Sequence, residues 1–228
     1  MHTNNSLKIA AFFDLDNTII TGTNSLLLYV RYLVRHKMIS RFHLLKGLIQ
    51  SALHKLDLVD VEGVLDKFTM SYKGKSEEEL KQIAGAWFSK EVVPIIASEA
   101  KKRIDWHKKQ GHVTTILSSA TQYVCEPVRN YLNLDATINT EVLVKDGQFT
   151  GYLKKPLCYH DGKILYSEDF AKKNHVDLAQ SYFYTDSITD LPMLEKVGHP
   201  VVINPDPLLK RHATKTGWPI ELWDETNA

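Results

Sequence analysis

The sequence has 228 residues, enough for one or two domains with a hydrophobic core that needs no disulfides. Hydrophobic residues make up 43% and charged residues 24%, which excludes a disordered chain, a collagen-like fibre and a disulfide scaffold. The 28 Lys and Arg residues nearly balance the 27 Asp and Glu residues, so the net charge of +1 gives no support to nucleic-acid binding.

The cysteines and the N-terminal residues indicate a cytoplasmic protein. Cys125 and Cys158 lie far apart and match no paired-cysteine motif, so we expect free thiols in a reducing compartment. The first eight residues lack the apolar run of a signal peptide. The apolar run from Leu26 to Val30 is far too short to span a bilayer.

The first predicted element is a strand over residues 8–13. Its sequence, Lys8-Ile9-Ala10-Ala11-Phe12-Phe13, is almost continuously apolar, which is typical of a parallel strand covered on both faces. It ends at the polar segment that begins with Asp14.

From Asn24 to about Ala100 the apolar residues recur at helical spacing, and no convincing strand interrupts the segment. A helix is predicted to begin after Ser76, which would act as the N-cap, with Glu79 completing a capping box.

Strand patterns return after this helical segment. Residues 113–117, 181–185 and 200–203 are predicted strands, and residues 141–144 and 148–152 form a predicted hairpin around Asp146-Gly147. Helices are expected at 167–174 and around 191–197. This order predicts an α/β fold: a Rossmann-like parallel-sheet core with an inserted helical cap. We assign residues 1–20 and 101–228 to the core and residues 21–100 to the cap.

Three predicted core strands are followed by polar residues. Because ligands bind beyond the carboxyl ends of parallel strands, we expect these residues to converge in one crevice. They are the pairs Asp14 and Asp16, Ser118 and Ser119, and Asp186 and Asp190. Gathered carboxylates repel one another unless a cation lies among them, and a hard divalent ion such as Mg²⁺ fits oxygen ligands.

The two aspartates after the first strand can take different chemical roles. One carboxylate can attack an electrophile while the other donates and then accepts a proton. A serine or threonine hydroxyl and a lysine ammonium would hold the phosphate oxygens. Lys163, which follows a glycine and begins a helix, is a plausible source of that ammonium.

Four segments together resemble the motifs of the haloacid dehalogenase-like hydrolases. The first is Asp14-Leu15-Asp16-Asn17-Thr18, which matches DxDxT, and the second is the apolar strand that ends in Ser118. Lys163 fits the third motif, and the acids Asp186 and Asp190, four apart, fit the fourth. The order and the segment between the first two motifs are similar to the phosphoserine-phosphatase-like subfamily with a helical cap. The resemblance extends from about Lys8 to Pro219.

This resemblance implies a role for each motif residue. Asp14 would form an aspartyl-phosphate, and Asp16 would protonate the leaving oxygen and then activate water. Ser118 and Lys163 would bind the phosphoryl group. Mg²⁺ would be held by the side chains of Asp14 and Asp186 and by the backbone carbonyl of Asp16. Asp190 would either position Lys163 or bind a metal-bound water.

Several assignments keep alternatives. Asp14 and Asp16 could form a strand-end turn, and Ser119 could bind phosphate in place of Ser118 or cap the next helix. Three further lysines could replace Lys163 as the phosphate-binding cation: Lys154, Lys155 and Lys172.

The sequence departs from phosphoserine phosphatases at one place. Those enzymes carry a glutamate shortly after DxDxT that helps to recognise the amino-acid part of the substrate. Here the segment from Thr21 to Ser25 contains no acid, so phosphoserine is in doubt as the substrate.

The first part of the cap is strongly basic. Residues 17–56 carry a charge of +6, which leaves −5 for the rest of the chain. The basic residues are Arg31, Arg35, Lys37, Arg41, Lys46 and Lys55. They could form a solvated helix face, attract an anionic metabolite, or contact anionic lipid as a peripheral membrane surface. Arg31 and Arg35 are the candidate specificity residues for an anionic metabolite.

Three functions follow from these observations. The leading one is a Mg²⁺-dependent phosphatase for a small phosphorylated metabolite. The second is a phospholipid or lipid-phosphate phosphatase at a membrane surface. The third is a non-catalytic phospho-ligand binding or signalling module, against which the presence of Asp16 argues because that residue can hydrolyse an acyl-phosphate.

Overall fold

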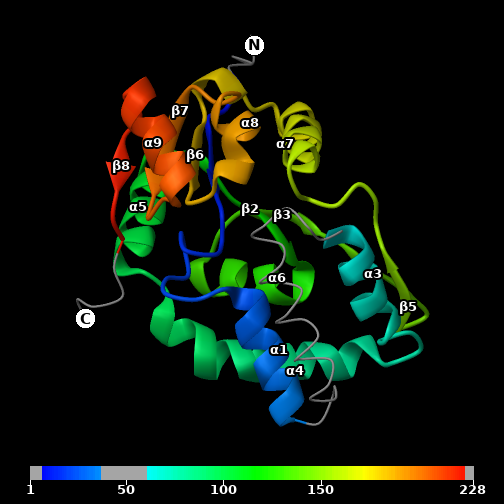
Figure 1. Cartoon of the computed structure of the whole chain (residues 1–228). Helices are drawn as coiled ribbons and strands as arrows, with labels where there is room; N and C mark the ends of the chain where they lie inside the picture. The colour runs from blue at the N-terminus through cyan, green and yellow to red at the C-terminus, as the bar shows by residue number, and fades with distance from the viewer. Residues whose placement is uncertain (1–6, 37–60, 224–228) are drawn as a thin grey trace.

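The computed structural model describes residues 7–36 and 61–223 of the chain. Its centre is a six-stranded parallel sheet in the order β3-β2-β1-β6-β7-β8, beside which lies the two-stranded hairpin β4-β5 (Figure 1). The strands are β1 (Ala10–Phe13), β2 (Val113–Thr121), β3 (Ala136–Thr140), β4 (Val142–Lys145), β5 (Gln148–Leu153), β6 (Tyr182–Thr185), β7 (His199–Ile203) and β8 (Ile220–Glu221).

Helices connect the strands. The α-helices are α1 (Ser25–Arg35), α3 (Val61–Met70), α4 (Glu77–Trp87), α5 (Ser98–Lys109), α6 (Gln122–Leu132), α7 (Asp161–Asn174), α8 (Leu191–Leu194) and α9 (Pro207–Thr216). A π-helical turn (Phe88–Val92) and a 3₁₀ turn (Val93–Ile95) join α4 to the segment before α5. Two further 3₁₀ turns, Leu178–Gln180 and Ile188–Asp190, flank β6.

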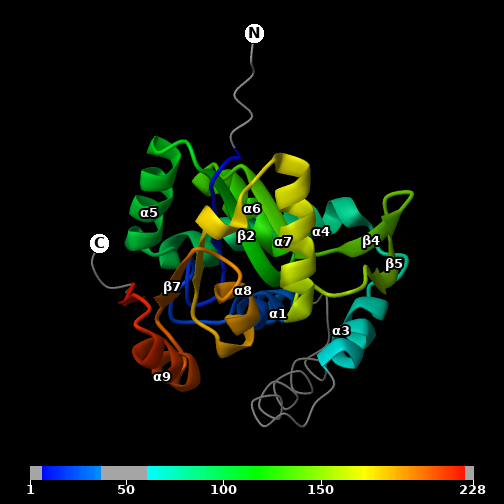
Figure 2. The same ribbon diagram turned by 90° about the horizontal axis from the view of Figure 1, so that it is seen from above.

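Strand β1 lies at the centre of the core. All four of its residues are completely buried, which explains the continuous apolar sequence. Because side chains alternate along a strand, Phe13 packs with the residues of α5 and α6 on one face, and Phe12 packs with α7, α8 and α9 on the other. The sheet is therefore the middle layer of three (Figure 2).

Between β1 and α5, the described residues form the helices α1, α3 and α4 and the two helical turns, which together we call the helical layer. Trp87 at the end of α4 is fully buried and packs edge-on against Tyr29 of α1, with the ring centroids 4.8 Å apart. The hairpin β4-β5 lies against α3, and in the turn after that helix the amide of Gly74 donates to the carbonyl of Phe149 at 2.8 Å. A hairpin that follows the core strands β2 and β3 thus contacts the helical layer.

The fold class predicted from the sequence is confirmed. Each predicted strand and the hairpin are present, and Ser76 is the N-cap of α4, accepting from the amide of Glu79 at 3.4 Å. The predicted helix at 167–174 was too short, because α7 begins at Asp161, and the helix expected around 191–197 ends at Leu194. The division into a core of residues 1–20 and 101–228 and a cap of residues 21–100 stays a prediction.

Three helices and two strands were absent from the sequence-based prediction. They are α5, α6, α9, β3 and β8. The helix α5 is polar, since eight of its twelve residues are charged or histidine, and only Ala100, Ile104 and His107 are buried. Helix α6 contains Pro127 in its interior, and β8 has two residues. Each of these features weakens the apolar periodicity on which such a prediction depends.

Among the described residues, no helix combines the length and the apolar character needed to cross a bilayer. Both cysteines are buried as free thiols.

A buried histidine makes the stability of this fold depend on pH. His107 of α5 shares a 2.8 Å hydrogen bond with the Tyr184 hydroxyl, and its Nδ1 lies 2.8 Å from Nδ1 of His112. Burial, the neighbouring imidazole of His112 and the charge of Arg103 lower the pKa of His107 to about 3. The folded protein therefore holds this imidazole neutral, whereas the unfolded chain protonates it below about pH 6.5.

We expect the stabilisation from neutral His107 to be complete above pH 6.5 and to decline as the pH falls, because only the unfolded chain then gains the proton. Between pH 6.5 and 5 the free energy of unfolding of the wild type should fall by up to about 2 kcal/mol more than that of His107→Gln. Urea denaturation at both pH values measures the difference, with the exposed His36→Gln as the control. Equal pH slopes for His107→Gln and the wild type would contradict this assignment.

Candidate active site

The register of the sheet brings the candidate residues to one edge. Phe13 of β1 pairs with Ile116 of β2 and with Tyr184 of β6. Asp14 and Asp186 follow the ends of β1 and β6, and Ser118 lies two residues beyond Ile116. The amide of Asp14 donates to the carbonyl of Tyr184 at 2.8 Å. The chain-distant polar residues therefore share the carboxyl-terminal edge of the sheet, where ligands bind in open α/β folds.

Lys163 joins two of the acids. Its ammonium lies 3.0 Å from Oδ1 of Asp14 and 2.7 Å from Oδ2 of Asp190, and its side chain is only 4% exposed. The hydroxyl of Thr185 donates to the same Asp190 oxygen at 2.6 Å. Asp190 thus fixes the Lys163 ammonium beside Asp14.

The glycine before Lys163 has a steric role. A Cβ atom at Gly162 would lie 1.8 Å from the carbonyl oxygen of Leu157, a distance that no real side chain could occupy. The close approach sets the first turn of α7 against the preceding loop and so places Lys163 at the sheet edge.

Asp16 lies on the loop after β1. The amide of Ser25, the first residue of α1, donates to Oδ1 of Asp16 at 2.7 Å. The loop closes on itself through the amide of Ile20, which donates to the carbonyl of Leu15 at 2.9 Å. These bonds hold the second aspartate at the boundary between the sheet and the helical layer.

The electrostatics of the site reflect burial of several acids. Burial raises the pKa of Asp14 to about 7 against the opposing charge of Lys163, and burial also raises the pKa of Asp16. Burial and the neighbouring carboxylate of Asp14 raise the pKa of Asp186 to about 8. Burial would lower the pKa of Lys163, but Asp14 and Asp190 hold it above its usual value. Among the residues that the structure describes, Lys163 is thus the one lysine within this cluster of four acids.

This excess of negative charge fits a cation. Among the described residues, no three or more His, Cys, Asp or Glu side chains are arranged to hold a metal ion. A metal at this edge would therefore take two carboxylates, those of Asp14 and Asp186, together with backbone and water oxygens. Mg²⁺ is commonly bound in this way, by one or two carboxylates with several waters retained.

Three polar residues support the loops of the site and were not found from the sequence. They are two asparagines and an aspartate. Asn17 adopts a left-handed conformation with φ of 52° and donates to Oδ2 of Asp186 at 2.9 Å. Asn204 donates to the carbonyl of Asn17 at 3.0 Å. Asp206 accepts from the amide of Ile188 at 2.7 Å. Asn17 could have been found from its place inside DxDNT, because asparagine tolerates the left-handed region.

The structure places the two candidate serines differently. Ser118 is 2% exposed, and its hydroxyl accepts from the amide of Ala120 at 3.2 Å. Ser119 is exposed and lines a cavity that Asp16 also lines. Both lie at the sheet edge, so the choice between them as phosphate ligand stays open.

The alternative lysines do not join the acid cluster. Lys154 pairs with Glu141 at 2.8 Å, and Lys155 pairs with Glu62 at 3.0 Å. Lys172 is exposed in the last turn of α7. Lys163 is the lysine that contacts Asp14 in the described part of the chain.

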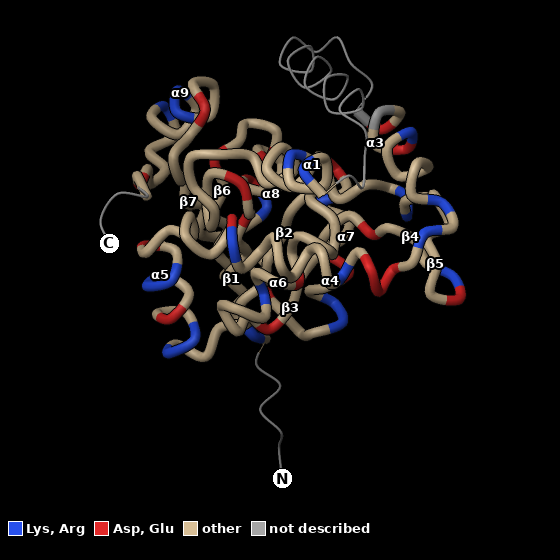
Figure 3. Tube along the Cα trace, turned by 90° about the horizontal axis from the view of Figure 1, so that it is seen from below, with Lys and Arg blue, Asp and Glu red and all other residues tan. Residues whose placement is uncertain are grey.

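The candidate specificity residues lie on the outer side of α1. Arg31 is exposed, and Arg35 is exposed and paired with Glu91 at 2.6 Å. Neither lines the cavity beside Asp16, and their role in specificity stays a prediction. The other four basic residues of residues 17–56 lie outside the described residues. In the part of the chain that is described, basic and acidic residues are interspersed (Figure 3).

The cavity beside Asp16 lies between the sheet edge and the helical layer. Its volume is about 270 Å³, slightly below the usual range for small-molecule sites. It is lined by residues of α1, α3 and α4 on one side and of β2, α6 and the hairpin on the other. Asp16 therefore lies between the acid cluster and this cavity.

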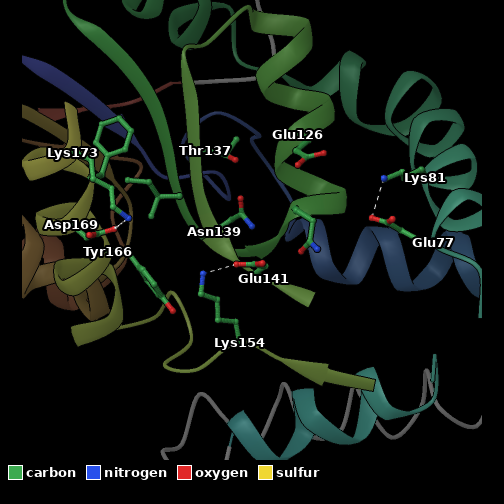
Figure 4. Close-up of a pocket in the computed structure, with 13 residues that line it drawn as sticks. Glu77, Lys81, Glu126, Thr137, Asn139, Glu141, Lys154, Tyr166, Asp169 and Lys173 are labelled. Carbon is green, nitrogen blue, oxygen red and sulfur yellow. Dashed lines mark hydrogen bonds and ion pairs between the residues drawn. The ribbon is translucent and has the colours of Figure 1, made fainter. Parts of the chain in front are cut away.

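A second pocket, of about 480 Å³, lies away from these acids (Figure 4). Several of its charged side chains pair with one another, as in Lys154 with Glu141 and Lys173 with Asp169. None of the candidate catalytic residues lines it.

Comparison with known proteins shows the family of this chain. The sequence model of the haloacid dehalogenase-like hydrolases matches residues 11–195. A histidinol-phosphatase of Neisseria meningitidis is 28% identical over 94% of this chain and 98% of its own length.

Two solved structures have the same fold. A Bordetella pertussis protein of unknown function superposes with a TM-score of 0.87 at 22% identity, covering 96% of this chain and all of that one. A phosphoserine phosphatase, solved as an analogue of its phospho-aspartyl intermediate, superposes with a TM-score of 0.65 at 19% identity, covering 97% and 95% of the two chains. With the family match and the phosphatase relative, the chain belongs to the haloacid dehalogenase-like hydrolases and is a phosphoric monoester hydrolase.

Proposed function

We propose that this chain is a Mg²⁺-dependent phosphatase that hydrolyses a small phosphomonoester through an aspartyl-phosphate on Asp14. The observation that carries the proposal is the buried contact of Asp14 with Lys163, which in turn is fixed by Asp190. A carboxylate held at a sheet edge beside a fixed ammonium can receive a phosphoryl group whose oxygens the ammonium neutralises. The solved relative that carries a phospho-aspartyl analogue supports the same chemistry.

The proposed reaction has two steps. In the first, Oδ of Asp14 bonds to phosphorus, the bond from phosphorus to the ester oxygen breaks, and Asp16 gives its proton to that oxygen. In the second, water loses a proton to Asp16 and attacks phosphorus, which releases phosphate and restores the Asp14 carboxylate. The raised pKa of Asp16 favours the protonated form that the first step requires.

The other side chains of the site hold charge and position. Lys163 would bind a phosphoryl oxygen, as would Ser118 or Ser119. Asp14 and Asp186 would hold the Mg²⁺ with the backbone carbonyl of Asp16, and the ion would supply positive charge against the phosphate oxygens. Asn17 orients the Asp186 carboxylate through its 2.9 Å hydrogen bond.

Asp14→Asn should reduce phosphate release from p-nitrophenyl phosphate by at least about 10³-fold, because the amide cannot act as the nucleophile. The rate of p-nitrophenolate formation measures this. Asp169→Asn removes an exposed aspartate that is paired with Lys173 and should retain the wild-type rate. A turnover rate of Asp14→Asn within tenfold of the wild-type rate would show that Asp14 is not the nucleophile.

Asp16→Asn should slow turnover by about 10²- to 10⁴-fold, because the general acid and base is lost while the Asn oxygen can still accept from Ser25. With an activated ester, whose leaving group needs no proton, the variant should accumulate covalently bound phosphate. Intact-protein mass spectrometry after an acid quench detects it as a phosphate adduct. A variant with wild-type turnover and no adduct would exclude Asp16 from this role.

Mg²⁺ should raise the melting temperature of the protein, because an ion that binds only the folded state stabilises it. The increase should be much smaller in Asp186→Asn, and chelation should stop the turnover of the wild type. Differential scanning fluorimetry with and without Mg²⁺ provides a readout that does not depend on activity. An equal thermal shift in Asp186→Asn would place the ion elsewhere.

A further inference from the structure

The cavity beside Asp16 has an apolar, aromatic lining. Six aromatic rings border it: Tyr29, Phe68, Tyr72, Tyr123, Phe149 and Tyr159. Several pack edge-on or tilted against one another, such as Tyr72 and Phe149 with centroids 6.0 Å apart and Tyr123 and Phe149 at 5.5 Å. Rings in such arrangements leave faces and edges for a further apolar group.

Charge is almost absent from the same lining. Of the residues that border the cavity in the described part of the chain, Asp16 is the one with a charged side chain. The hydroxyl of Tyr123 already donates to Glu77 at 3.0 Å. A leaving group with an ammonium or a carboxylate would lose its hydration here and find no ion-pair partner among the described lining residues except Asp16 for an ammonium.

The tyrosines add neutral polarity. Tyr29 and Tyr72 are each 5% exposed, and their hydroxyls have no hydrogen-bond partner among the described residues. Burial raises the pKa of both, so these hydroxyls stay neutral. The lining thus combines apolar surface with uncharged hydroxyls.

Asp16 connects this cavity to the chemistry. It belongs to the acid cluster through its place after β1, and it also lines the cavity. An ester oxygen that receives its proton from Asp16 therefore has its carbon chain directed toward the aromatic lining. The absence of an acid from Thr21 to Ser25, next to Asn24 and Ser25 of the cavity, agrees with a leaving group that carries no ammonium.

We infer that the alcohol part of the substrate is an uncharged hydrophobic group, aromatic or aliphatic, that occupies this cavity. The inference rests on the proposed phosphatase function and specifies its substrate class. Such a group gains free energy from burial against the rings, whereas phosphoserine would bring two charges into an apolar space.

A panel of alkyl phosphates tests the inference on the wild-type protein in the presence of Mg²⁺. The esters are methyl phosphate, 2-phenylethyl phosphate, hexyl phosphate, a short-chain lysophosphatidate below its micellar concentration, and phosphoserine. We expect kcat/KM for at least one hydrophobic ester to exceed that for phosphoserine by about 100-fold and that for methyl phosphate by about 30-fold. The inference would be overturned if kcat/KM for phosphoserine or for methyl phosphate were as high as that for every hydrophobic ester.

The arms of the panel distinguish two sources of the hydrophobic group. A preference for 2-phenylethyl phosphate supports an aromatic metabolite, and a preference for lysophosphatidate supports a lipid-derived ester; both support an uncharged hydrophobic leaving group. Hydrolysis of p-nitrophenyl phosphate tests the phosphatase function separately from the substrate class. If the protein hydrolyses this ester but shows no preference for hydrophobic esters in the panel, the inference alone fails. If it hydrolyses neither this ester nor any member of the panel, the proposed function fails.

A variant locates the preference in the cavity. Phe68 of α3 is partly buried and lines the cavity, so Phe68→Ala should lower kcat/KM for the preferred hydrophobic ester about tenfold more than kcat/KM for methyl phosphate. Phe170→Ala removes a partly buried ring of α7 that does not line the cavity and should preserve the preference. Equal losses for both esters in Phe68→Ala, with the melting temperature retained, would place the hydrophobic group elsewhere.

Discussion

The contact of Lys163 with Asp14 and Asp190 is the interaction on which the rest of the site depends. Three ionisable groups lie within hydrogen-bond distance in a buried position, where an unpaired charge would be costly. The lysine offsets part of the repulsion between the acids, and Asp190 with Thr185 fixes its direction. In the proposed mechanism, a divalent cation would offset the negative charge that remains around Asp14 and Asp186.

The fold supplies the precision that this contact needs. The register of β1 with β2 and β6 places the carboxyl ends of these strands side by side. The close packing of Gly162 against the carbonyl oxygen of Leu157 fixes the position of the first turn of α7. The helical layer then closes over the edge and leaves the aromatic cavity beside Asp16. Charged groups are concentrated in the acid cluster on one side of Asp16 and apolar surface in the cavity on the other, so one residue separates two chemically different environments.

Much of this arrangement could be predicted from the sequence, and the exceptions have physical reasons. The apolar run before Asp14 and the polar ends of the later strands were sufficient to predict the sheet and its crevice. Asn17 was missed because its contribution is a left-handed backbone and a bond to an acid 169 residues away. The aromatic cavity was missed because Tyr29, Phe68 and Phe149 come from three separate elements, and only the packed structure shows that they line one space.

The central claim is that Asp14 itself receives the phosphoryl group, and one measurement tests it most directly. The wild-type protein is mixed with an activated phosphomonoester and Mg²⁺, quenched in acid within the first turnover, and treated with borohydride to reduce any acyl-phosphate to an alcohol. Peptide mass spectrometry should then find homoserine in place of Asp14 and unmodified aspartate at position 16. Rapid phosphate release without reduction at Asp14, or reduction at another acid, would contradict the account.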